Sequence, residues 1–486
     1  MKLFLIWADK ETVFRKFMED LTKAGHQIVY WVGLGEGKDG LQGTIFHDHY
    51  AAWSGTPAEG FETLQFPPPG KDLIEKMYKT ESLVLTMMNK RFDTLCVDER
   101  RHIYYQMVGY WYGVLKKFQP DLIVYPAIPH TVYNYVISEL AKLLGIRQAM
   151  LEDPWVANRI LVYNDWLVGN QKLVELAEKN KNKQIPLKNL SPDIRDYYLS
   201  QISSPRSEPE YMGFYRKQFG KWPGIIKHKA KILKESILRG DVFQKLVGEI
   251  SKRFKPNLKK EYNKLVKSPD FSKPFIYVPL GFQPERVTSP QGGVFVDQIL
   301  MIETLSAALP PGWSIYVKEH PGQWWLRRNI RYSSSRYPSY YRRIAMANNV
   351  VLVPIDENSL SLIEKSKAVA TVTGTAGWEA ILRLKPALIF GYPWYRDFPS
   401  IFKVDGAEAC RKALAEIQAG FKFREKDVIN YLKAFDEATV FGYLESVPGR
   451  KLDLTFEQCL ANVAKVILSE LLSLKSAQDV NTAGNS

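Results

Sequence analysis

The stretch SIYVKEHPGQWW, residues 314–325, decides the fold of the second half of the chain. An apolar, β-branched run ends here in three ionisable residues, Lys318, Glu319 and His320, and a Pro-Gly pair then breaks the strand. A short apolar run bounded by breakers is typical of a buried strand. In open α/β sheets ligands bind at the edge formed by the carboxyl ends of the strands. The three ionisable residues are therefore predicted to lie at a ligand-binding edge.

Similar strands, separated by helical patterns, occur on both sides of this stretch. In the second half they are predicted at 274–282, 313–321, 348–356, 368–374 and 386–391. In the first half they are predicted at 2–8, 26–34, 121–127 and 146–154. Alternating strands and helices indicate parallel sheets with helices on both faces.

The 486 residues are too many for one ordinary core, so more than one domain is expected. The strand-helix rhythm stops in the middle of the chain and then resumes. The predicted fold class is α/β, with two Rossmann-like, doubly wound domains facing a cleft. The predicted segments are an N-terminal domain (1–200), a basic helical linker (201–270), a C-terminal domain (271–425), and C-terminal helices ending in a disordered tail (426–486).

Most of the formal net charge of +14 lies in one segment, 206–267, which has 17 Lys or Arg residues and 6 Asp or Glu residues. Three interpretations are open: a solvated helical face, attraction to an anionic membrane surface, or nucleic-acid binding. No RNA- or DNA-binding motif accompanies the charge, so no nucleic-acid partner is expected. A protein that binds the membrane would use this segment to reach the lipid surface.

The N-terminus and the cysteines indicate a cytoplasmic protein. The opening MKLFLIWADKE has too few apolar residues for a signal peptide or a spanning helix. Cys96, Cys410 and Cys459 are far apart and form no CxxC pair, so neither a disulfide framework nor a zinc site is predicted. The predicted location is the cytoplasm. The basic segment additionally suggests peripheral binding to the inner face of the membrane.

The second domain contains a candidate anion site in TVTGTAGWEA, residues 371–380. Gly374 allows a tight turn, and Thr375 is predicted to cap the helix that follows. A helix N-terminus presents free N–H groups and a positive dipole end, so it can bind a phosphate. His320, from a neighbouring strand end, is expected to donate a second hydrogen bond, and Lys318 to add charge.

Other strand ends of this domain carry polar residues too, notably Asp356 and Thr373. Each candidate also has a structural interpretation: a lone histidine often only holds a loop, a threonine caps a helix, and a lysine is solvated. Their joint occurrence at one predicted sheet edge favours a ligand site.

Two stretches, 277–324 and 371–391, resemble the bacterial capsule and surface polysaccharide biosynthesis family, and 125–160 resembles it more loosely. These are GT-B glycosyltransferases that include transferases of Kdo and related acidic sugars. The pair His320-Pro321 also resembles the His-Pro motif of bacterial sialyltransferases, which binds the CMP of a CMP-sugar. The resemblance implies a GT-B fold and a CMP-sugar donor, with 1–200 as the acceptor-side domain and 271–425 as the nucleotide-sugar domain.

The resemblance also implies roles for individual residues. His320 and Thr375 would contact the donor phosphate, and Glu379 the ribose or the sugar. The remaining residues of the predicted donor site are Lys318, Pro321, Thr373, Gly374 and Asp356. The residues predicted to face the sugar and the cleft are Gln283, Glu285, Thr288, Ser289 and Arg159.

Sugar transfer requires a base for the acceptor hydroxyl, or a carboxylate nucleophile if configuration is retained. Asp153 and Glu152, at a predicted strand end, are the first candidates, and His130 lies nearby in the same interpretation. Sialyltransferases have a doubled acidic motif followed by Gly, whereas Pro154 follows here, and such a pair is also common in a solvated turn or a cap. No DxD lies near a strand end and no His/Cys/Asp cluster has metal-ligand spacing, so no metal and no cofactor are expected.

The predicted function is transfer of an acidic sugar, such as Kdo or a sialic or related nonulosonic acid, from a CMP-sugar to a surface-glycan or lipid-linked acceptor. Two alternatives stay open on the same scaffold: a UDP-sugar transferase and a nucleotide-sugar epimerase. A third is a non-catalytic basic protein that binds a surface or a nucleic acid. The sugar, the acceptor and the stereochemical course are not predicted.

Overall fold

The computed structural model of the chain describes residues 1–8, 12–34, 43–62, 66–203, 257–325, 335–444 and 454–483. Of the basic segment 206–267, only 257–267 lies within this part of the chain. The predicted linker and its membrane contact therefore lie largely outside the described residues.

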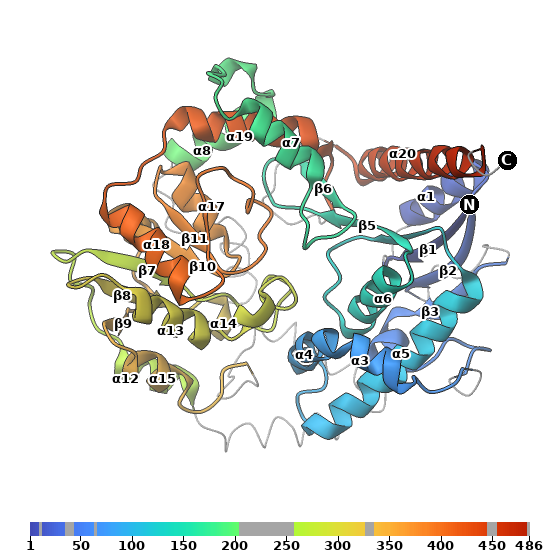
Figure 1. Cartoon of the computed structure of the whole chain (residues 1–486), viewed down its shortest axis with the longest axis horizontal. Helices are drawn as coiled ribbons and strands as arrows, with labels where there is room; N and C mark the ends of the chain where they lie inside the picture. Colours follow the sequence, from blue (N-terminus) through green and yellow to red (C-terminus); the bar gives the residue numbers. More distant parts are fainter. Residues whose placement is uncertain are drawn as a thin grey trace, which may run out of the picture. The chain divides into compact units, whose positions relative to one another are not determined.

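The chain divides into two compact units, and each contains one sheet (Figure 1). The first comprises Met1–Tyr197, Asn430–Ser446 and Leu452–Ser486, and the second comprises Tyr198–Ile429 and Val447–Lys451. Both are α/β, which confirms the predicted fold class of two Rossmann-like units. The C-terminal segment, predicted as a separate part, belongs mostly to the first unit.

In the described residues of the first unit, the sheet has seven strands in the order β13-β6-β5-β4-β1-β2-β3. Their bounds are β1 Lys2–Ile6, β2 Gln27–Gly33, β3 Ile45–Asp48, β4 Leu122–Tyr125, β5 Arg147–Glu152, β6 Arg159–Tyr163 and β13 Val440–Phe441. Strands β1 to β5 are parallel, whereas β6 is antiparallel to both β5 and β13. The carboxyl ends of β1 to β5 therefore lie at one edge.

Helices cover both faces of this sheet. Leu3 and Leu5 of β1 pack toward α1 and α20, whereas Phe4 between them lies 6.2 Å from Trp111 of α5, ring centre to ring centre. The helices of this unit and its boundary are α1 Thr12–Lys23, α2 His49–Ser54, α3 Lys71–Lys76, α4 Tyr78–Met87, η3 Met88–Lys90, α5 Val97–Phe118, α6 Val132–Leu143, α7 Gln171–Asn180, η4 Leu187–Asn189, α8 Pro192–Ser203, α19 Glu425–Ala438 and α20 Phe456–Ala483. Leu3 and Leu5 bury on one face of the sheet and Phe4 on the other, because successive side chains of a strand point to opposite faces.

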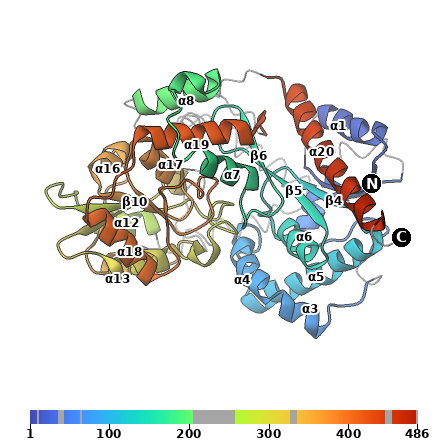
Figure 2. The ribbon, with the colours of Figure 1, turned by 45° about the horizontal axis from the view of Figure 1, so that its top comes forward.

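Helix α20, the last of the chain, lies beside α1, the first (Figures 1 and 2). Leu460, Val463 and Ile467 of α20 join the same buried cluster as Phe14 and Leu21 of α1. The tail predicted to be disordered from residue 476 is instead helical as far as Ala483. The turn-forming residues near the end of the chain favoured the wrong prediction, because they have low helix propensity.

The second sheet has six strands in its described residues, in the order β12-β11-β10-β7-β8-β9, and every pairing is parallel. The strands are β7 Phe275–Pro279, β8 Ser314–Lys318, β9 Val350–Leu352, β10 Ala368–Thr371, β11 Ala387–Ile389 and β12 Phe402–Lys403. The helices are α12 Leu258–Leu265, η5 Gly293–Val296, α13 Gln298–Ala308, α14 Gly322–Trp325, α15 Tyr340–Met346, α16 Ser359–Lys365, α17 Thr375–Leu382 and α18 Ala407–Gln418. The strand predicted from the stretch 314–325 is confirmed as β8.

Alternate residues of the central strands β7 and β8 bury against helices on opposite faces. Ile276 and Ile315 pack in the cluster that includes α13, α15 and α18, whereas Tyr277 and Tyr316 pack toward α16 and α17. Because both faces are covered, these strands read as continuous apolar runs in the sequence. Their polar residues appear only where the strands end.

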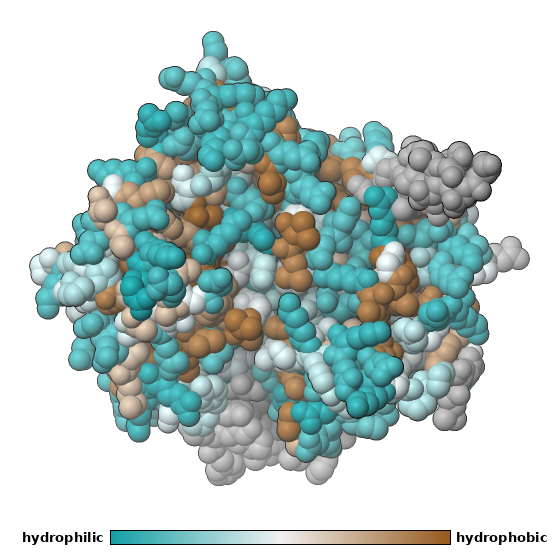
Figure 3. All heavy atoms as spheres, viewed as in Figure 1, coloured by the Kyte–Doolittle hydropathy of each residue, from teal (hydrophilic) through white to brown (hydrophobic). Residues whose placement is uncertain are grey.

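The surface is mainly hydrophilic. On the face shown in Figure 3, hydrophobic residues lie in small separate groups among polar ones. The most exposed large apolar side chains of the described residues, such as Met346 and Val294, belong to different elements. Within the described residues, none of the helices combines the length and the apolar character needed to cross a bilayer.

A buried histidine in the first unit predicts sensitivity to acid. His47 of β3 donates from Nε2 to the carbonyl oxygen of Thr56 (2.8 Å) and accepts at Nδ1 from the hydroxyl of Tyr30 (2.9 Å). Burial lowers the pKa of His47 to about 4. The unfolded chain therefore takes up a proton at higher pH than the folded chain, so stability is lost as the pH falls from about 6.5 toward 4.

We expect this histidine to remove about 2 kcal/mol of unfolding free energy between pH 7 and pH 5. Denaturant unfolding of the wild type and of His47→Gln at both pH values measures it, because glutamine has one donor and one acceptor group but does not titrate. The matched control is His102→Gln on α5, where the histidine is exposed. Equal pH dependence of the wild type and His47→Gln would contradict the expectation.

Candidate functional site

The loop after β7, residues 280–292, joins the neighbouring strand ends of the second sheet. The backbone N–H of Gln283 donates to the side-chain oxygen of Gln323, which follows β8 (3.2 Å). The hydroxyl of Thr373, which follows β10, donates to the carbonyl oxygen of Val287. Strand β7 lies between β8 and β10, so this loop makes one continuous surface from three strand ends.

His320 lies directly after β8, at the predicted edge. Its Nδ1 accepts a hydrogen bond from the N–H of Gly322 (3.1 Å), which places the ring proton of the neutral form on Nε2. Burial lowers the pKa of His320 to about 4; Glu319 opposes this shift, whereas Arg336 and Lys318 add to it. At neutral pH this side chain is an uncharged donor.

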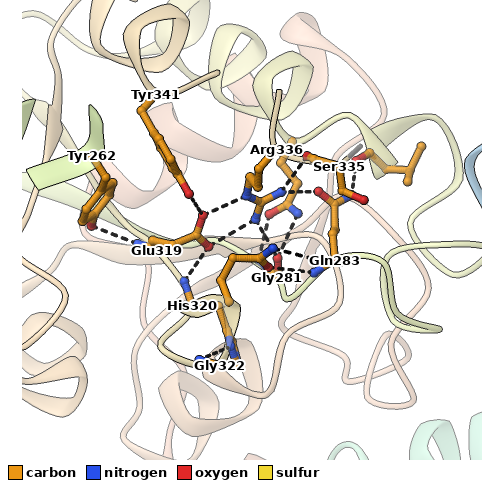
Figure 4. Close-up of polar contacts among 12 residues, drawn as sticks. Tyr262, Gly281, Gln283, Glu319, His320, Gly322, Ser335, Arg336 and Tyr341 are labelled. Atoms are coloured by element: carbon orange, nitrogen blue, oxygen red, sulfur yellow. Dashed lines mark hydrogen bonds and ion pairs between the residues drawn. The ribbon is translucent and has the colours of Figure 1, made fainter. Parts of the chain in front are cut away.

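A fully buried ion pair lies beside His320 (Figure 4). Both side chains, Glu319 and Arg336, have no exposed surface. The guanidinium donates to the two carboxylate oxygens at 2.8 and 3.2 Å, and the hydroxyl of Tyr341 donates to Oε2 at 2.5 Å. The backbone N–H of His320 donates to Oε1 at 2.7 Å.

Arg336 also binds the loop after β7. Its Nη1 donates to the side-chain oxygen of Gln283, and its Nη2 donates to the carbonyl oxygen of Gly281 (3.0 Å). Glu319 belongs to the stretch 314–325 but received no role from the sequence, and Arg336 was missed. A carboxylate at the end of a buried strand does require a partner, and this is the signal that could have predicted a cation here.

Lys318 has structural partners. Its side chain is 5% exposed, and Nζ donates to the carbonyl oxygen of Glu357 and to the hydroxyl of Ser359 (2.8 Å). The hydroxyl of Tyr277 also donates to Ser359, at 3.4 Å. The charge of Lys318 therefore fastens the start of α16 to β8, and its predicted contact with a phosphate stays a prediction.

Helix α17 begins one residue earlier than predicted. Gly374 is the N-cap, and Thr375 is the first helical residue, with an exposed side chain. The predicted cap at Thr375 is therefore wrong: the hydroxyl of Thr371 accepts the N–H of Gly374 (3.0 Å), and the hydroxyl of Thr375 bonds to Glu379. The helix N-terminus itself lies where the sequence predicted it.

Glu379, one turn into α17, is partly buried. Burial raises the pKa of its carboxyl group, whereas Arg383 and the hydrogen bond from Thr375 oppose the shift. Tyr395 lies close by, and its hydroxyl donates to the carbonyl oxygen of Gly374. A carboxyl group in this position can accept hydrogen bonds from the hydroxyls of a ribose or a sugar.

The predicted polar loop folds on itself. The carbonyl oxygen of Glu285 accepts the N–H groups of Thr288 and Ser289, at 3.0 and 2.9 Å, and also the hydroxyl of Thr288, at 2.9 Å. Thr288 and Ser289 are buried, so both shape the loop from inside. Asp356 is exposed in the loop after β9.

The first sheet carries the predicted acidic pair at the carboxyl end of β5. Asp153 is buried, with Oδ1 accepting the N–H of Trp155 (3.1 Å) and Oδ2 accepting the N–H of Leu444 (3.2 Å). Glu152 is also buried and accepts the hydroxyl of Tyr163 (2.8 Å). Through these hydrogen bonds both carboxylates stabilise the fold around the end of β5.

His130 lies in the loop after β4, at the same edge of the first sheet, and is partly buried. Its Nδ1 contacts the carbonyl oxygen of Ile128 at 2.8 Å. Because a carbonyl oxygen only accepts, Nδ1 carries the proton of the neutral ring and Nε2 is the acceptor nitrogen. This tautomer suits a general base.

Arg159, predicted to face the sugar and the cleft, is engaged in ionic contacts within the first unit. Its guanidinium binds Asp193 at 2.8 and 3.0 Å, Asp436 at 2.9 Å and the hydroxyl of Ser191 at 2.8 Å. These partners belong to α8, α19 and the residue preceding α8, and the chain distance to Asp436 hid the contact from sequence reasoning. The arginine fastens the first unit together.

No three His, Cys, Asp or Glu side chains among the residues that the structure describes gather closely enough to hold a metal ion. Metal independence stays a prediction.

Residues 285–410 match the family model described as "Capsule polysaccharide biosynthesis protein". None of the curated proteins matches the chain. Among solved structures, two Kdo transferases of KpsC from Thermosulfurimonas dismutans are similar: the β-Kdo 2,4 transferase (14% identity, 64% of this chain and 87% of that chain, TM-score 0.27) and the β-Kdo 2,7 transferase (11%, 74% and 89%, TM-score 0.29). A UDP-GlcNAc 2-epimerase from Methanocaldococcus jannaschii is also similar (13%, 90% and 98%, TM-score 0.24).

At such identities and TM-scores, the solved structures carry no argument about this chain. The family match does, because it is made on sequence and includes both the His-Pro pair and the start of α17. The resemblance found in the sequence is thereby confirmed for about a quarter of the chain. Residues 285–410, which include strands β8 to β12 and the polar residues that follow them, are thus similar to the capsule polysaccharide biosynthesis family.

Proposed function

We propose that the chain is a glycosyltransferase of capsule or surface polysaccharide synthesis, and that it transfers an acidic sugar from a CMP-sugar. One observation carries the proposal: the Nε2–H donor of His320 and the N-terminus of α17 follow strands on either side of β7, inside the family-matched segment. Two strand spacings put these strand ends about 10 Å apart, with the loop after β7 between them. This separation suits a nucleotide phosphate and its ribose.

In this proposal the site stabilises the leaving phosphate without a metal ion. The N–H groups of the first turn of α17 and the helix dipole face the phosphate, and His320 donates to it from Nε2. Glu379 accepts from a ribose or sugar hydroxyl. Fixed donors of this kind stabilise the charge that develops on the leaving group, and they need not reorganise during the reaction.

For the acceptor hydroxyl we assign the base to His130. Both oxygens of Asp153 already accept backbone N–H groups, so this side chain holds the loop after β5 in place. His130 has an acceptor nitrogen at Nε2 in its neutral form. If the reaction retains configuration, a carboxylate nucleophile is needed instead, and Asp153 or Glu152 stays the candidate.

The acceptor in this proposal is a surface glycan or a lipid-linked glycan, and the location is the cytoplasm. Contact with an anionic membrane through 206–267 stays a prediction from charge alone. Retention on anionic liposomes at low salt and release at high salt would support it, because salt screens such attraction.

Donor binding tests the proposal. Removing the imidazole in His320→Ala takes one hydrogen bond from a charged phosphate, so we expect CMP affinity to fall about tenfold or more. Calorimetry with CMP, UDP and an oligonucleotide separates the CMP-sugar enzyme from its alternatives. The matched control is His102→Ala on α5, which should bind CMP like the wild type.

The helix N-terminus has its own pair of variants. Thr375→Pro removes one backbone N–H but fits the first helical position, since Gly374 before it is extended (φ −65°, ψ 152°). Thr375→Ala removes only the hydroxyl. We expect the proline variant to bind CMP more weakly than the alanine variant. Unchanged CMP affinity in both His320→Ala and Thr375→Pro would remove the donor-site assignment.

A further inference from the structure

We propose that Glu319 and Arg336 are positioning residues of the donor site, which hold the His320 ring in one orientation against the loop after β7. The inference rests on the proposed function for its ligand. Neither residue was assigned a role by sequence reasoning. Figure 4 shows both side chains between His320 and the loop residues Gly281 and Gln283.

The backbone of His320 is held on both sides. Its N–H donates to Oε1 of Glu319 at 2.7 Å, and its carbonyl oxygen accepts the N–H of Gln323 at 2.9 Å. The ring is held as well, because Nδ1 accepts the N–H of Gly322 at 3.1 Å. With these groups engaged, Nε2–H is the polar group of the ring that remains to meet a ligand.

Together with bonds to the loop after β7, these hydrogen bonds form a closed ring. Glu319 binds Arg336, Arg336 binds the side chain of Gln283, and the backbone of Gln283 exchanges two hydrogen bonds of 3.2 Å with the side chain of Gln323. Gln323 then returns to His320. A shift of the loop after β7 must therefore break a bond or move the histidine.

Stability alone does not require this chemistry. A buried ion pair contributes little more than well-packed apolar side chains of similar volume, and often less. Directional bonds to a charge do fix geometry, and the guanidinium offers a planar fork that reaches the carboxylate, Gln283 and Gly281 together. Glu319 and Arg336 are therefore arranged as supporting residues that hold His320 in position.

The pair also acts on His320 electrostatically. The charged groups that act on this ring are Glu319, Arg336 and Lys318. Glu319 raises the pKa of His320, and Arg336 lowers it. Removing either charge should therefore shift the titration of the ring in opposite directions: downward in Glu319→Gln and upward in Arg336→Gln.

The decisive variant replaces both members of the pair. Glu319→Leu with Arg336→Met leaves no unpaired buried charge and is expected to fold. We expect it to keep the circular dichroism of the wild type, to bind CMP about tenfold or more weakly, and to lose the single Nε2–H tautomer in ¹⁵N NMR of His320. A folded double variant with wild-type CMP affinity and an unchanged tautomer would overturn the inference.

A matched control comes from the first unit. Arg159→Met combined with Asp193→Leu and Asp436→Leu removes a partly buried ionic cluster, and it should change neither the His320 signals nor CMP affinity. The single variants Glu319→Gln and Arg336→Gln provide the opposite pKa shifts, and shifts of the same sign would also contradict the inference. Failure of the wild type to bind CMP would reject the proposed function alone, because the tautomer and titration of His320 need no ligand.

Discussion

Replacing His130 by Asn is expected to lower turnover between about a hundredfold and ten-thousandfold, the range typical of losing a general base. The asparagine amide can still donate to the carbonyl oxygen of Ile128, as Nδ1 does in the histidine, so the loop after β4 should keep its shape. What is lost is the acceptor nitrogen at Nε2. The measurement is the rate of sugar transfer at saturating CMP-sugar, with CMP affinity unchanged.

The matched control is Asp153→Asn. The aspartate accepts two backbone N–H groups, and an amide can accept only with its oxygen, so this variant should lose stability, by about 2 kcal/mol, while keeping most of its turnover. The reverse pattern, a stable Asp153→Asn with little turnover and an active His130→Asn, would assign catalysis to the carboxylate.

Arg336→Met alone is expected to produce the largest loss of stability among these variants, about 3 to 5 kcal/mol. It leaves the carboxylate of Glu319 buried without its counter-charge, although Tyr341 and the N–H of His320 still donate to it. Denaturant unfolding of the second unit measures the effect. Adding Glu319→Leu should restore most of the loss.

A surface pair offers the comparison. Lys403 binds Asp397 at 2.9 Å, and its side chain is 56% exposed. Lys403→Met should therefore change stability by less than about 1 kcal/mol. If Arg336→Met were as mild as Lys403→Met, the charge of Glu319 would not depend on the arginine.

The strands and the sheet edge could be predicted from sequence because both depend on local pattern. Short apolar runs such as 315–317 are typical of strands buried on both faces of a parallel sheet. Parallel pairing brings the carboxyl ends of these strands together. His320 and the start of α17 were found for this reason. The position of the cap was missed by one residue, since Thr371 and Gly374 share a local bond that propensity does not describe.

Long-range partners could not be predicted in the same way. Glu319 required a cation, but the residues from 327 to 343 contain six arginines, and no pattern indicates which one reaches it. Arg159 meets Asp436 far along the chain, and Asp153 meets the backbone of Leu444. For such residues a strand-end position indicates a functional site and a structural contact equally well.

The packing of α20 on α1 has a consequence for the order in which the chain folds during synthesis. The apolar face formed by Phe14 and Leu21 emerges from the ribosome first, but Leu460, Val463 and Ile467, which cover it, emerge after the whole second unit. A domain normally folds once its last residue has been made. The apolar face of α1 therefore stays uncovered until α20 has been made, and transiently exposed apolar surface of this kind promotes aggregation in the absence of chaperones.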